Sequence, residues 1–414
     1  MASKRVVVTG LGVVSCFGNE TSPFFESLLE GKSGVSKITS FDASSFPTQI
    51  AAEIKDFDAG DYLDKKQARR VDKFIAYTVV GGKKALESAG LMRSQFDSLN
   101  KQRSGVIIGS GMGGMERYVE GVTSLNEKGW KRVSPFFIPY VITNMGSGML
   151  AMELGFMGPN YSISTACATG NHCIIAAAEH IRKGEADLML AGGAEAAIVP
   201  IGLAGFCACK ALSERNDDPT KASRPWDKGR DGFVMGEGAG VLVLESLEHA
   251  LKRGATIYAE YLGGGMSCDA HHITDPKPDG QGVQICIKAA LDNAKITESQ
   301  VDYINAHGTS TPVGDMAEVS ALKKVFKNPQ RVIMNSTKGL LGHALGAAGG
   351  IEAIVSVLSL NQQKVHPMPN LIDPEPNIDF ILPTKAMDAS INVALSNSFG
   401  FGGHNASILF GKYN

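Results

Sequence analysis

The chain has 414 residues, 43% of them hydrophobic and 20% charged, which is the composition of an ordinary globular protein and the length of two or three domains. Its formal net charge of −2 argues against a protein that binds nucleic acid or another polyanion. The 7 cysteines form no paired C-x-x-C sets, so we expect free thiols in a reducing compartment and no metal site.

The apolar runs are too short to cross a membrane, so we expect no membrane partner. Strand-like residues begin at Arg5, which predicts that no signal or transit peptide is present. The chain is therefore expected to be either cytoplasmic or the mature form of an organelle enzyme.

The first elements in chain order are a buried strand over residues 4–14, a short helix over 24–30 and a long helix over 62–90. The strand ends in a glycine turn without G-x-G-x-x-G, which excludes a dinucleotide site. The long helix carries a basic cluster, which is either a solvated face or a docking patch for an acidic partner. This cluster comprises Lys65, Lys66, Arg69 and Arg70.

A second buried strand is expected over residues 105–109, followed by an apolar, proline-containing loop at 134–139 and a helix at 144–154. The loop and the helix suit either a two-fold partner or an acyl pocket, with core packing as the equal alternative. Further strands are expected at 187–193 and 241–245.

Between these strands lies a stretch, residues 162–170, in which small residues surround Cys167. The pattern predicts a strand, a tight turn that holds Cys167, and a buried helix that continues to Ile181. A thiol at a helix N-terminus sits at the positive end of the helix dipole, so we expect the pKa of Cys167 to be lowered. The alternative is a buried structural cysteine.

Near Ala255 the pattern starts again, because the segments 256–264, 301–308 and 332–360 repeat the order of the first half. Two similar α/β halves are therefore predicted, spanning residues 1–254 and 255–414. Reactive groups in such sheets lie beyond the carboxyl ends of strands. We therefore expect Cys167, His307 and His343 to meet in one crevice.

Three motifs of the second half bear on chemistry. His307 ends a strand before a hydroxyl-rich loop, His343 lies at a strand-to-helix turn, and residues 397–405 form a loop rich in glycine and phenylalanine. A lone histidine is more often structural. One thiol with two imidazoles, however, suits acyl transfer to sulfur followed by condensation, in which imidazole N–H groups stabilise an enolate.

These motifs resemble the β-ketoacyl-acyl-carrier-protein synthases, the elongating condensing enzymes of type II fatty-acid synthesis. The resemblance covers the chain from Val-Val-Val-Thr-Gly-Leu-Gly at 6–12 to Phe-Gly-Phe-Gly-Gly at 399–403. It is closest to the synthase I/II branch, whose Cys-His-His set matches Cys167, His307 and His343. It implies an α/β, thiolase-like five-layer α-β-α-β-α fold built from two pseudo-symmetric halves.

The resemblance also implies roles for individual residues. Cys167 would accept the acyl group, His307 and His343 would promote decarboxylation of a malonyl group, and Lys338 would act electrostatically. The remaining implied site residues are Phe401, Phe399 and Gly402 for the oxyanion hole and gate, Asp315 and Glu318 for a supporting network, and Thr309 and Thr311 for the pantetheine arm.

The partner implied is an acyl-carrier protein in its acyl and malonyl forms, docked on Lys65, Lys66, Arg69, Arg70 and Lys210. No cofactor is implied, because the substrates carry phosphopantetheine on that protein. A homodimer is expected. His404 and the sequence Asn171-His172-Cys173 look like plastid and cyanobacterial members, which suggests the plastid stroma as an alternative to a bacterial cytoplasm.

Three other functions remain open. A polyketide ketosynthase is disfavoured by the lack of an appended acyltransferase region. A thiolase would carry a second catalytic cysteine in the C-terminal loop, and this sequence has none after Cys286. A non-catalytic subunit that only shapes an acyl tunnel would lack the nucleophile that is present here.

Overall fold

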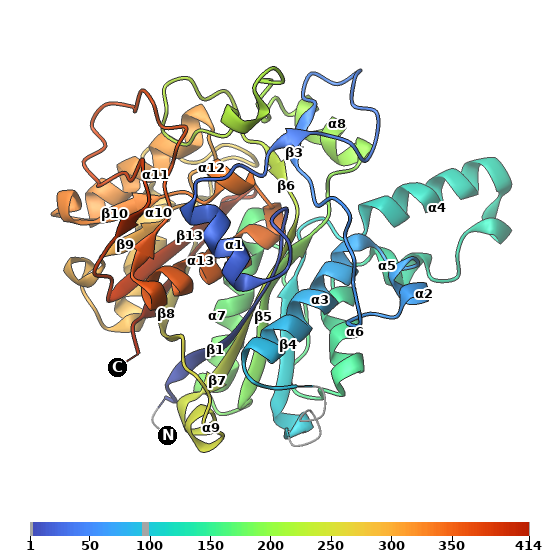
Figure 1. Cartoon of the computed structure of the whole chain (residues 1–414), viewed down its shortest axis with the longest axis horizontal. Coiled ribbons are helices and arrows are strands. Elements are labelled where there is room, and N and C mark those ends of the chain that lie inside the picture. The colour runs from blue at the N-terminus through green and yellow to red at the C-terminus, as the bar shows by residue number, and fades with distance from the viewer. Residues whose placement is uncertain (1–2, 93–98, 414) are drawn as a thin grey trace.

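The computed structural model describes residues 3–92 and 99–413, and within these ranges nine strands form one mixed sheet (Figure 1). The sheet divides into two groups at the junction where β1 pairs antiparallel with β8. The N-terminal group comprises, in spatial order, β4 (Ser104–Gly109), β5 (Leu188–Glu195), β7 (Gly238–Ser246) and β1 (Val6–Val14). The C-terminal group comprises β8 (Ala259–Cys268), β14 (His404–Gly411), β13 (Val393–Gly400), β9 (Tyr303–Asn305) and β10 (Ile333–Asn335).

The two groups repeat one pattern of strand directions. In the N-terminal group β4 is parallel to β5, and β5, β7 and β1 alternate in direction. In the C-terminal group β9 is parallel to β13, and β13, β14 and β8 alternate in direction. The two pseudo-symmetric halves expected from the sequence are thus present, while the division at residues 254 and 255 stays a prediction.

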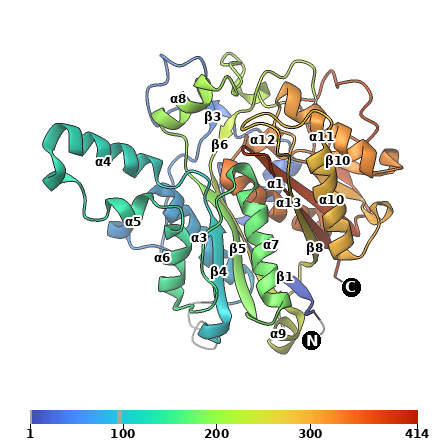
Figure 2. The same ribbon diagram turned by 180° about the vertical axis from the view of Figure 1, so that it is seen from behind.

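Helices occupy three layers around the two groups of strands (Figures 1 and 2). Helices α3 (Lys73–Ser88) and α6 (Met145–Leu154) cover the outer face of the N-terminal group. Helix α10 (Gln281–Ala294), with α11 (Pro312–Val325) beside it, covers the outer face of the C-terminal group. Helices α7 (Thr169–Arg182) and α13 (Ala348–Gln362) lie between the groups. The arrangement is the expected five-layer α-β-α-β-α fold.

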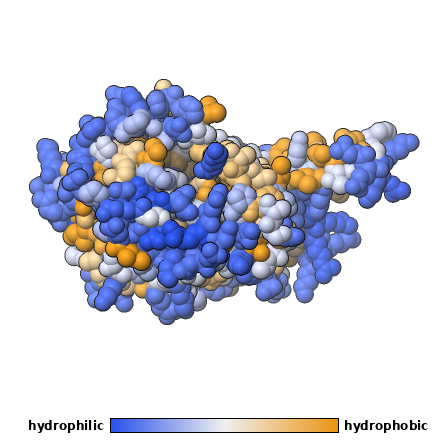
Figure 3. Space-filling view, turned by 90° about the horizontal axis from the view of Figure 1, so that it is seen from above, coloured by the Kyte–Doolittle hydropathy of each residue, from blue (hydrophilic) through white to orange (hydrophobic). Residues whose placement is uncertain are grey.

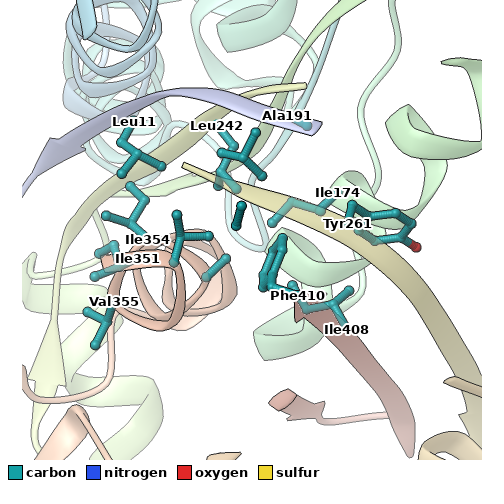
Figure 4. Close-up of a cluster of buried hydrophobic side chains, with 14 of the residues drawn as sticks. Leu11, Ile174, Ala191, Leu242, Tyr261, Ile351, Ile354, Val355, Ile408 and Phe410 are labelled. Atoms are coloured by element: carbon teal, nitrogen blue, oxygen red, sulfur yellow. The ribbon is translucent and has the colours of Figure 1, made fainter. Parts of the chain in front are cut away.

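The central layer is held by apolar side chains from both groups of strands (Figure 4). Leu11 and Leu242 face Ile351 from one side, while Ile174 and Phe410 belong to the same buried cluster. Each such side chain contributes about 1.5–3 kcal/mol when it is buried. A mostly apolar helix that is buried on all sides, as α13 is, is stable only inside the molecule.

The first turns of α7 and α13 touch each other, and glycine makes this contact possible. A Cβ atom on Gly170 would lie 2.5 Å from the backbone nitrogen of Gly350, a distance that real side chains do not adopt. The turns that precede the two helices, one from each half of the chain, are therefore brought side by side.

The other elements lie around this framework. A three-stranded sheet contains β2 (Ser36–Lys37), β3 (Ile50–Ala52) and β6 (Met235–Gly236), and a two-stranded sheet contains β11 (Lys364–Val365) and β12 (Met387–Asp388). Helices α4 and α5 form an arm that projects from the body (Figure 1). The remaining helices are α1 (Thr21–Leu29), α2 (Lys65–Ala68), α4 (Met115–Lys128), α5 (Phe137–Val141), α8 (Pro200–Ala208), α9 (Leu247–Lys252) and α12 (Lys338–Leu341).

Two helical predictions were wrong in detail. The long helix expected over residues 62–90 is two helices, α2 and α3, because Asp72 breaks it. The carboxylate of Asp72 accepts a hydrogen bond from the backbone N–H of Phe74 and starts α3 as its N-cap. The loop expected at 134–139 contains the start of α5.

Two predictions about strands were also wrong. The strand expected before Cys167 is an extended segment outside the sheet, where the N–H of Thr165 donates to the hydroxyl of Thr169 rather than to a strand. The loop expected over 397–405 is largely β13 and β14, joined by a short turn at residues 401–403.

Candidate active site

Cys167 lies in a 3-10 turn, Ala166–Ala168, directly before α7. Ala166 has φ of 49°, the left-handed region that a side chain rarely adopts. The matching turn of the second half, Leu345–Ala347 before α13, begins in the same way, with φ of 50° at Leu345. Strain of this kind persists where the surroundings fix it and is typical of functional sites.

The thiol of Cys167 is half-buried between charged groups. Burial raises the pKa of this thiol to about 12, and the carboxylates of Glu195 and Glu352 act in the same direction. The charge of Lys338 lowers it. The lowered pKa expected from the helix terminus was therefore wrong for the free protein, since loss of water around the sulfur outweighs the favourable charges.

His307 follows β9, and the carboxylate of Glu318 on α11 fixes its backbone. One oxygen of Glu318 accepts from the N–H of His307 at 2.9 Å, and the other accepts from the N–H of Gly308 at 2.8 Å. The side-chain amide of Asn397 donates to the same carboxylate at 3.2 Å. Glu318 therefore sets where the His307 ring enters the site.

His343 precedes the turn at Leu345 and is 2% exposed. Its Nδ1 accepts a hydrogen bond from the backbone N–H of Leu345 at 3.3 Å. In a neutral ring the proton must then be on Nε2, which becomes a hydrogen-bond donor. Burial first, and the charge of Lys338 second, lower the pKa of His343 well below its usual value.

The two imidazoles lie together in one cavity with the thiol. The ring centroids of His307 and His343 are 5.3 Å apart. Both residues line a cavity of about 340 Å³, here called the histidine cavity, which Cys167 also lines. Burial, Lys338 and His343 lower the pKa of His307 as well, so both rings are neutral near pH 7. The site thus presents a sulfur beside two uncharged imidazole rings.

Lys338 lies on α12 and is buried, with an ion pair to Glu352 on α13. Sequence analysis placed Glu318 in this lysine network and missed Glu352. Burial raises the pKa of Glu352 to about 7, although the charge of Lys338 opposes this shift. Glu352 is the single charged residue in the apolar segment 344–360, and that isolation is the signal by which it could have been found.

The turn between β13 and β14 closes over the cysteine. A Cβ atom on Gly400 would lie 2.9 Å from the backbone nitrogen of Cys167, so only glycine allows this approach. Phe401 lines the histidine cavity, and the Phe399 ring lies 5.5 Å from the His307 ring between centroids. Gly402 has φ of 87°, which suits glycine in this turn.

Thr309 and Thr311 lie in the wall of the histidine cavity, and their hydroxyls are 2.9 Å apart. Asp315 lies behind them rather than in the wall. Its carboxylate accepts from the backbone N–H groups of Ser310 and Trp226, each at 3.0 Å, and pairs with Arg230. Asp315 therefore holds the threonine loop against the neighbouring segment.

A second cavity, of about 410 Å³, also begins at Cys167. Its wall is mostly apolar, so it is called the apolar cavity here. Its larger side chains are Met112, Met115, Ile201, Phe206, Leu345 and Phe401. A flexible hydrocarbon suits such a wall.

Two family models match the chain in succession. The β-ketoacyl synthase N-terminal domain matches residues 3–250, and the β-ketoacyl synthase C-terminal domain matches residues 258–372. The chain belongs to the β-ketoacyl synthase family. Members of this family are condensing acyltransferases with a thiolase-like fold, as the resemblance of the motifs implied.

Individual relatives of this β-ketoacyl synthase are similar along almost the whole chain. The 3-oxoacyl-[acyl-carrier-protein] synthase I, chloroplastic, of Arabidopsis thaliana is 58% identical over 99% of this chain and 87% of its own length. The 3-oxoacyl-[acyl-carrier-protein] synthase 2 of Vibrio harveyi is 51% identical over 100% of this chain and 99% of its own length. A ketosynthase solved with its type II PKS acyl-carrier protein and bound to the hexaketide is 33% identical, with a TM-score of 0.90 and full coverage of both chains.

The predicted docking residues of the synthase lie in two places. Lys65, Lys66, Arg69 and Arg70 are exposed on α2 and the turn after it. Lys210 is exposed at the end of α8 and lines the histidine cavity, whereas the α2 cluster lines neither cavity. His404 packs edge to face against His172 and lies outside both cavity walls.

No helix within residues 3–92 and 99–413 is long and apolar enough to cross a membrane. The same part of the chain contains no group of three or more His, Cys, Asp or Glu side chains placed to hold a metal ion.

Proposed function

We propose that this chain is a 3-oxoacyl-[acyl-carrier-protein] synthase of fatty-acid elongation, type II or type I. It transfers an acyl group to Cys167 and condenses it with malonyl-acyl-carrier protein, which yields 3-oxoacyl-acyl-carrier protein and carbon dioxide. The observation that carries the proposal is the meeting of Cys167, His307 and His343 in one cavity, from which an apolar cavity leads away.

In the first step the sulfur of Cys167 attacks the thioester carbon of the acyl-carrier protein. The carbon–sulfur bond to the phosphopantetheine breaks. The phosphopantetheine thiolate leaves and takes up the proton that the Cys167 thiol gave up. The backbone N–H groups of Cys167 and Phe401 are assigned to the oxyanion. In support, the Phe401 N–H donates to no other atom of the described chain, and Gly400 brings the two backbones together.

In the second step the malonyl group loses its carboxylate as carbon dioxide, and the bonding electrons form an enolate on the thioester. Neutral His307 and His343 donate hydrogen bonds to the enolate oxygen. The enolate carbon then attacks the acyl carbon on Cys167, and the sulfur leaves. Support comes from the lowered pKa of both rings and from the Nε2 proton that Leu345 imposes on His343.

Lys338 acts on the Cys167 thiol and on both imidazoles without transferring a proton. Its charge lowers the pKa of the thiol and of both imidazoles. The pantetheine arm is assigned to Thr309 and Thr311, and the gate to Phe401 with Phe399 and Gly402. No cofactor is required, because the substrates bring their own phosphopantetheine.

Fatty-acid elongation is favoured over polyketide synthesis by sequence similarity. The chain is 58% and 51% identical to 3-oxoacyl-[acyl-carrier-protein] synthases, but 33% identical to the type II polyketide ketosynthase. A non-catalytic role is disfavoured because the thiol and both histidines are present at one cavity.

The partner proposed is an acyl-carrier protein that docks on the α2 cluster and Lys210. A cationic surface attracts an acidic partner, and the related ketosynthase was solved with its acyl-carrier protein. The enzyme is proposed to work in a bacterial cytoplasm or in the plastid stroma, in keeping with its bacterial and chloroplastic relatives.

A homodimer is proposed through the arm. Large hydrophobic side chains are exposed along it, and Figure 3 shows hydrophobic residues on the arm and at its base. Exposed apolar patches of this kind mark protein interfaces. The residues are Tyr118, Val119, Val122, Leu125, Trp130, Phe136, Ile138 and Ile142.

Mass spectrometry tests the proposed function. The chain is incubated with acyl-acyl-carrier protein, and a mass increase equal to the acyl group is expected on Cys167. Addition of malonyl-acyl-carrier protein should then remove this mass and release 3-oxoacyl-acyl-carrier protein. A chain that stays unmodified would instead support the non-catalytic subunit.

A further inference from the structure

Glu195 is a buried carboxylate to which the proposed chemistry assigns no role. It is the last residue of β5, it is 0% exposed, and it lies in the wall of the apolar cavity. Among the described residues of that wall it is the one carboxylic acid, and burial raises the pKa of its carboxyl group to about 7. A carboxylate is costly to bury unless hydrogen bonds satisfy it, so its partners show what it holds.

Four donors converge on this carboxylate. The hydroxyl of Ser110 and the N–H of Met112 donate to Oε1 at 2.7 and 3.1 Å. The N–H groups of Gly111 and Gly346 donate to Oε2 at 2.9 and 3.0 Å. Both oxygens are therefore fully used by the protein and have no capacity left for a ligand.

These donors come from two adjoining segments of the apolar cavity, one from each half of the chain, here called its two walls. Residues 110–112 follow β4 in the N-terminal half, and Met112 lines the cavity. Gly346 follows Leu345, which lines the cavity from the C-terminal half. A Cβ atom on Gly346 would lie 2.6 Å from Oε2, so the contact depends on glycine. One oxygen thus joins Gly111 to Gly346, which lies 151 residues from Glu195 along the chain.

We propose that Glu195 is a positioning residue that holds the two walls of the apolar cavity against each other, and thereby sets how well Cys167 accepts long acyl chains. This inference rests on the proposed function and deepens it. A hydrocarbon gains from a cavity only where the walls stay in contact with it. A short chain reaches little of that wall, so it depends less on Glu195.

Glu195→Gln tests the inference. The amide keeps one acceptor oxygen and replaces the other with an N–H₂ donor, so either Ser110 and Met112 or Gly111 and Gly346 lose their acceptor and the hold on the walls is weakened. Ser110→Ala is the matched control, since it removes one donor and leaves the oxygen that joins Gly111 to Gly346 intact. Glu195→Asp is a second variant that keeps the charge but is too short to reach both walls.

The measurement is the rate at which Cys167 gains mass from butyryl- and from myristoyl-acyl-carrier protein. We expect Glu195→Gln and Glu195→Asp to lower the myristoyl rate relative to the butyryl rate by about tenfold, as loss of a hydrogen bond to a charged group implies. Ser110→Ala should keep the wild-type ratio. Because Glu195 also raises the pKa of the Cys167 thiol, its removal changes both rates alike, and the ratio isolates the effect of the wall.

Decarboxylation of malonyl-acyl-carrier protein serves as the second measurement, because it does not use the apolar cavity. It should stay within about threefold of wild type in both Glu195 variants, well below the tenfold effect of the lost hydrogen bond. An unchanged ratio in acylated variants, or equal losses in acylation and decarboxylation, would overturn the inference. A wild-type chain that accepts neither acyl group would overturn the proposed function and the inference together.

Discussion

The imidazole rings of His307 and His343 meet edge to face, with an interplanar angle of 85°. One ring follows a strand of the C-terminal group and the other precedes the central helix α13, so tertiary structure alone brings them together. The perpendicular arrangement lets two N–H donors reach one oxygen from different directions. A single buried lysine acts on both rings.

Replacement of that lysine should slow alkylation of the nucleophile. Lys338→Met removes a charge that lowers the pKa of the Cys167 thiol, so less thiolate is present at a given pH. We expect alkylation of Cys167 by iodoacetamide near pH 8 to slow by about three- to tenfold, which corresponds to a shift of about 0.5–1 pKa unit. Lys327→Met, at an exposed lysine, is the control and should react at the wild-type rate. Equal rates in Lys338→Met would refute the electrostatic role of Lys338.

The catalytic histidines should destabilise the folded chain in acid because they are held neutral. The pKa of His307 and His343 is well below 6.5 in the folded chain, whereas the unfolded chain takes up protons as the pH falls through 6.5. Each of these histidines should therefore lower the free energy of unfolding below about pH 6.5, by up to about 1.4 kcal/mol per pH unit, while buried carboxyl groups with a raised pKa, such as Glu352, act in the opposite direction. Urea unfolding of wild type and His343→Asn between about pH 7.5 and 5.5 isolates the histidine contribution, because the stability of the variant should rise relative to wild type as the pH falls. Identical slopes would mean that His343 is protonated in the folded state.

The two half-reactions should separate in variants of the nucleophile. Cys167→Ser should abolish acyl transfer, and normal condensation in that variant would exclude Cys167 as the nucleophile. Cys167→Gln should keep or raise decarboxylation of malonyl-acyl-carrier protein, because the glutamine side chain resembles an acylated thiol. Adding His343→Ala to Cys167→Gln should lower this rate by about 10²–10³-fold, the usual effect of removing one oxyanion donor. Release of carbon dioxide is the measurement.

Binding of acyl-carrier protein to the α2 cluster should depend on the salt concentration. The double variant Lys65→Glu, Arg69→Glu reverses charge on the exposed α2 cluster and should weaken binding of acyl-carrier protein more at low than at high ionic strength. Calorimetric titration at two salt concentrations measures the dissociation constant. Lys327→Glu serves as the control for a change of net charge. An affinity that does not change in the double variant would move the docking site away from α2.

The glycine contact between the central helices should be sensitive to a single methyl group. Gly170→Ala places a Cβ atom 2.5 Å from the backbone of Gly350, so we expect a loss of roughly 1–3 kcal/mol in the free energy of unfolding despite the better helix propensity of alanine. Gly205→Ala in α8 is the matched control, since a Cβ atom there has nothing within 4 Å, and it should be neutral or slightly stabilising. Urea unfolding compares the two, and equal stability would show that the helices can separate at no cost.

Much of the fold could be predicted from the sequence because its inner strands are continuous apolar runs. The strands β1, β5 and β7 were all expected from such runs, as was the repetition of the pattern in the second half. The strand β13 was missed because its centre is polar. Ser396, Asn397 and Ser398 are fully buried there, so the usual apolar signal is absent.

The reactive residues and the supporting residues Asp315 and Glu318 could be named from motifs, but the contacts of Glu352 and Glu195 could not. The isolation of Glu352 in an apolar segment marks the residue but not its partner, and no local pattern records the contact of Glu195 with Gly346. The pKa of Cys167 was predicted in the wrong direction for a related reason. A helix terminus is visible in the sequence, whereas the loss of water around a sulfur depends on the packed structure.

The histidine cavity and the apolar cavity both border the sulfur of Cys167, and this fixes the order in which the substrates bind. A hydrocarbon tail held in the apolar cavity leaves the histidine cavity vacant, so the two carrier-bound substrates can occupy it in turn. The carrier that delivers the tail has to depart before the carrier of the extender unit arrives. The arrangement of the two cavities alone therefore makes the two carrier proteins bind alternately, and no domain has to move.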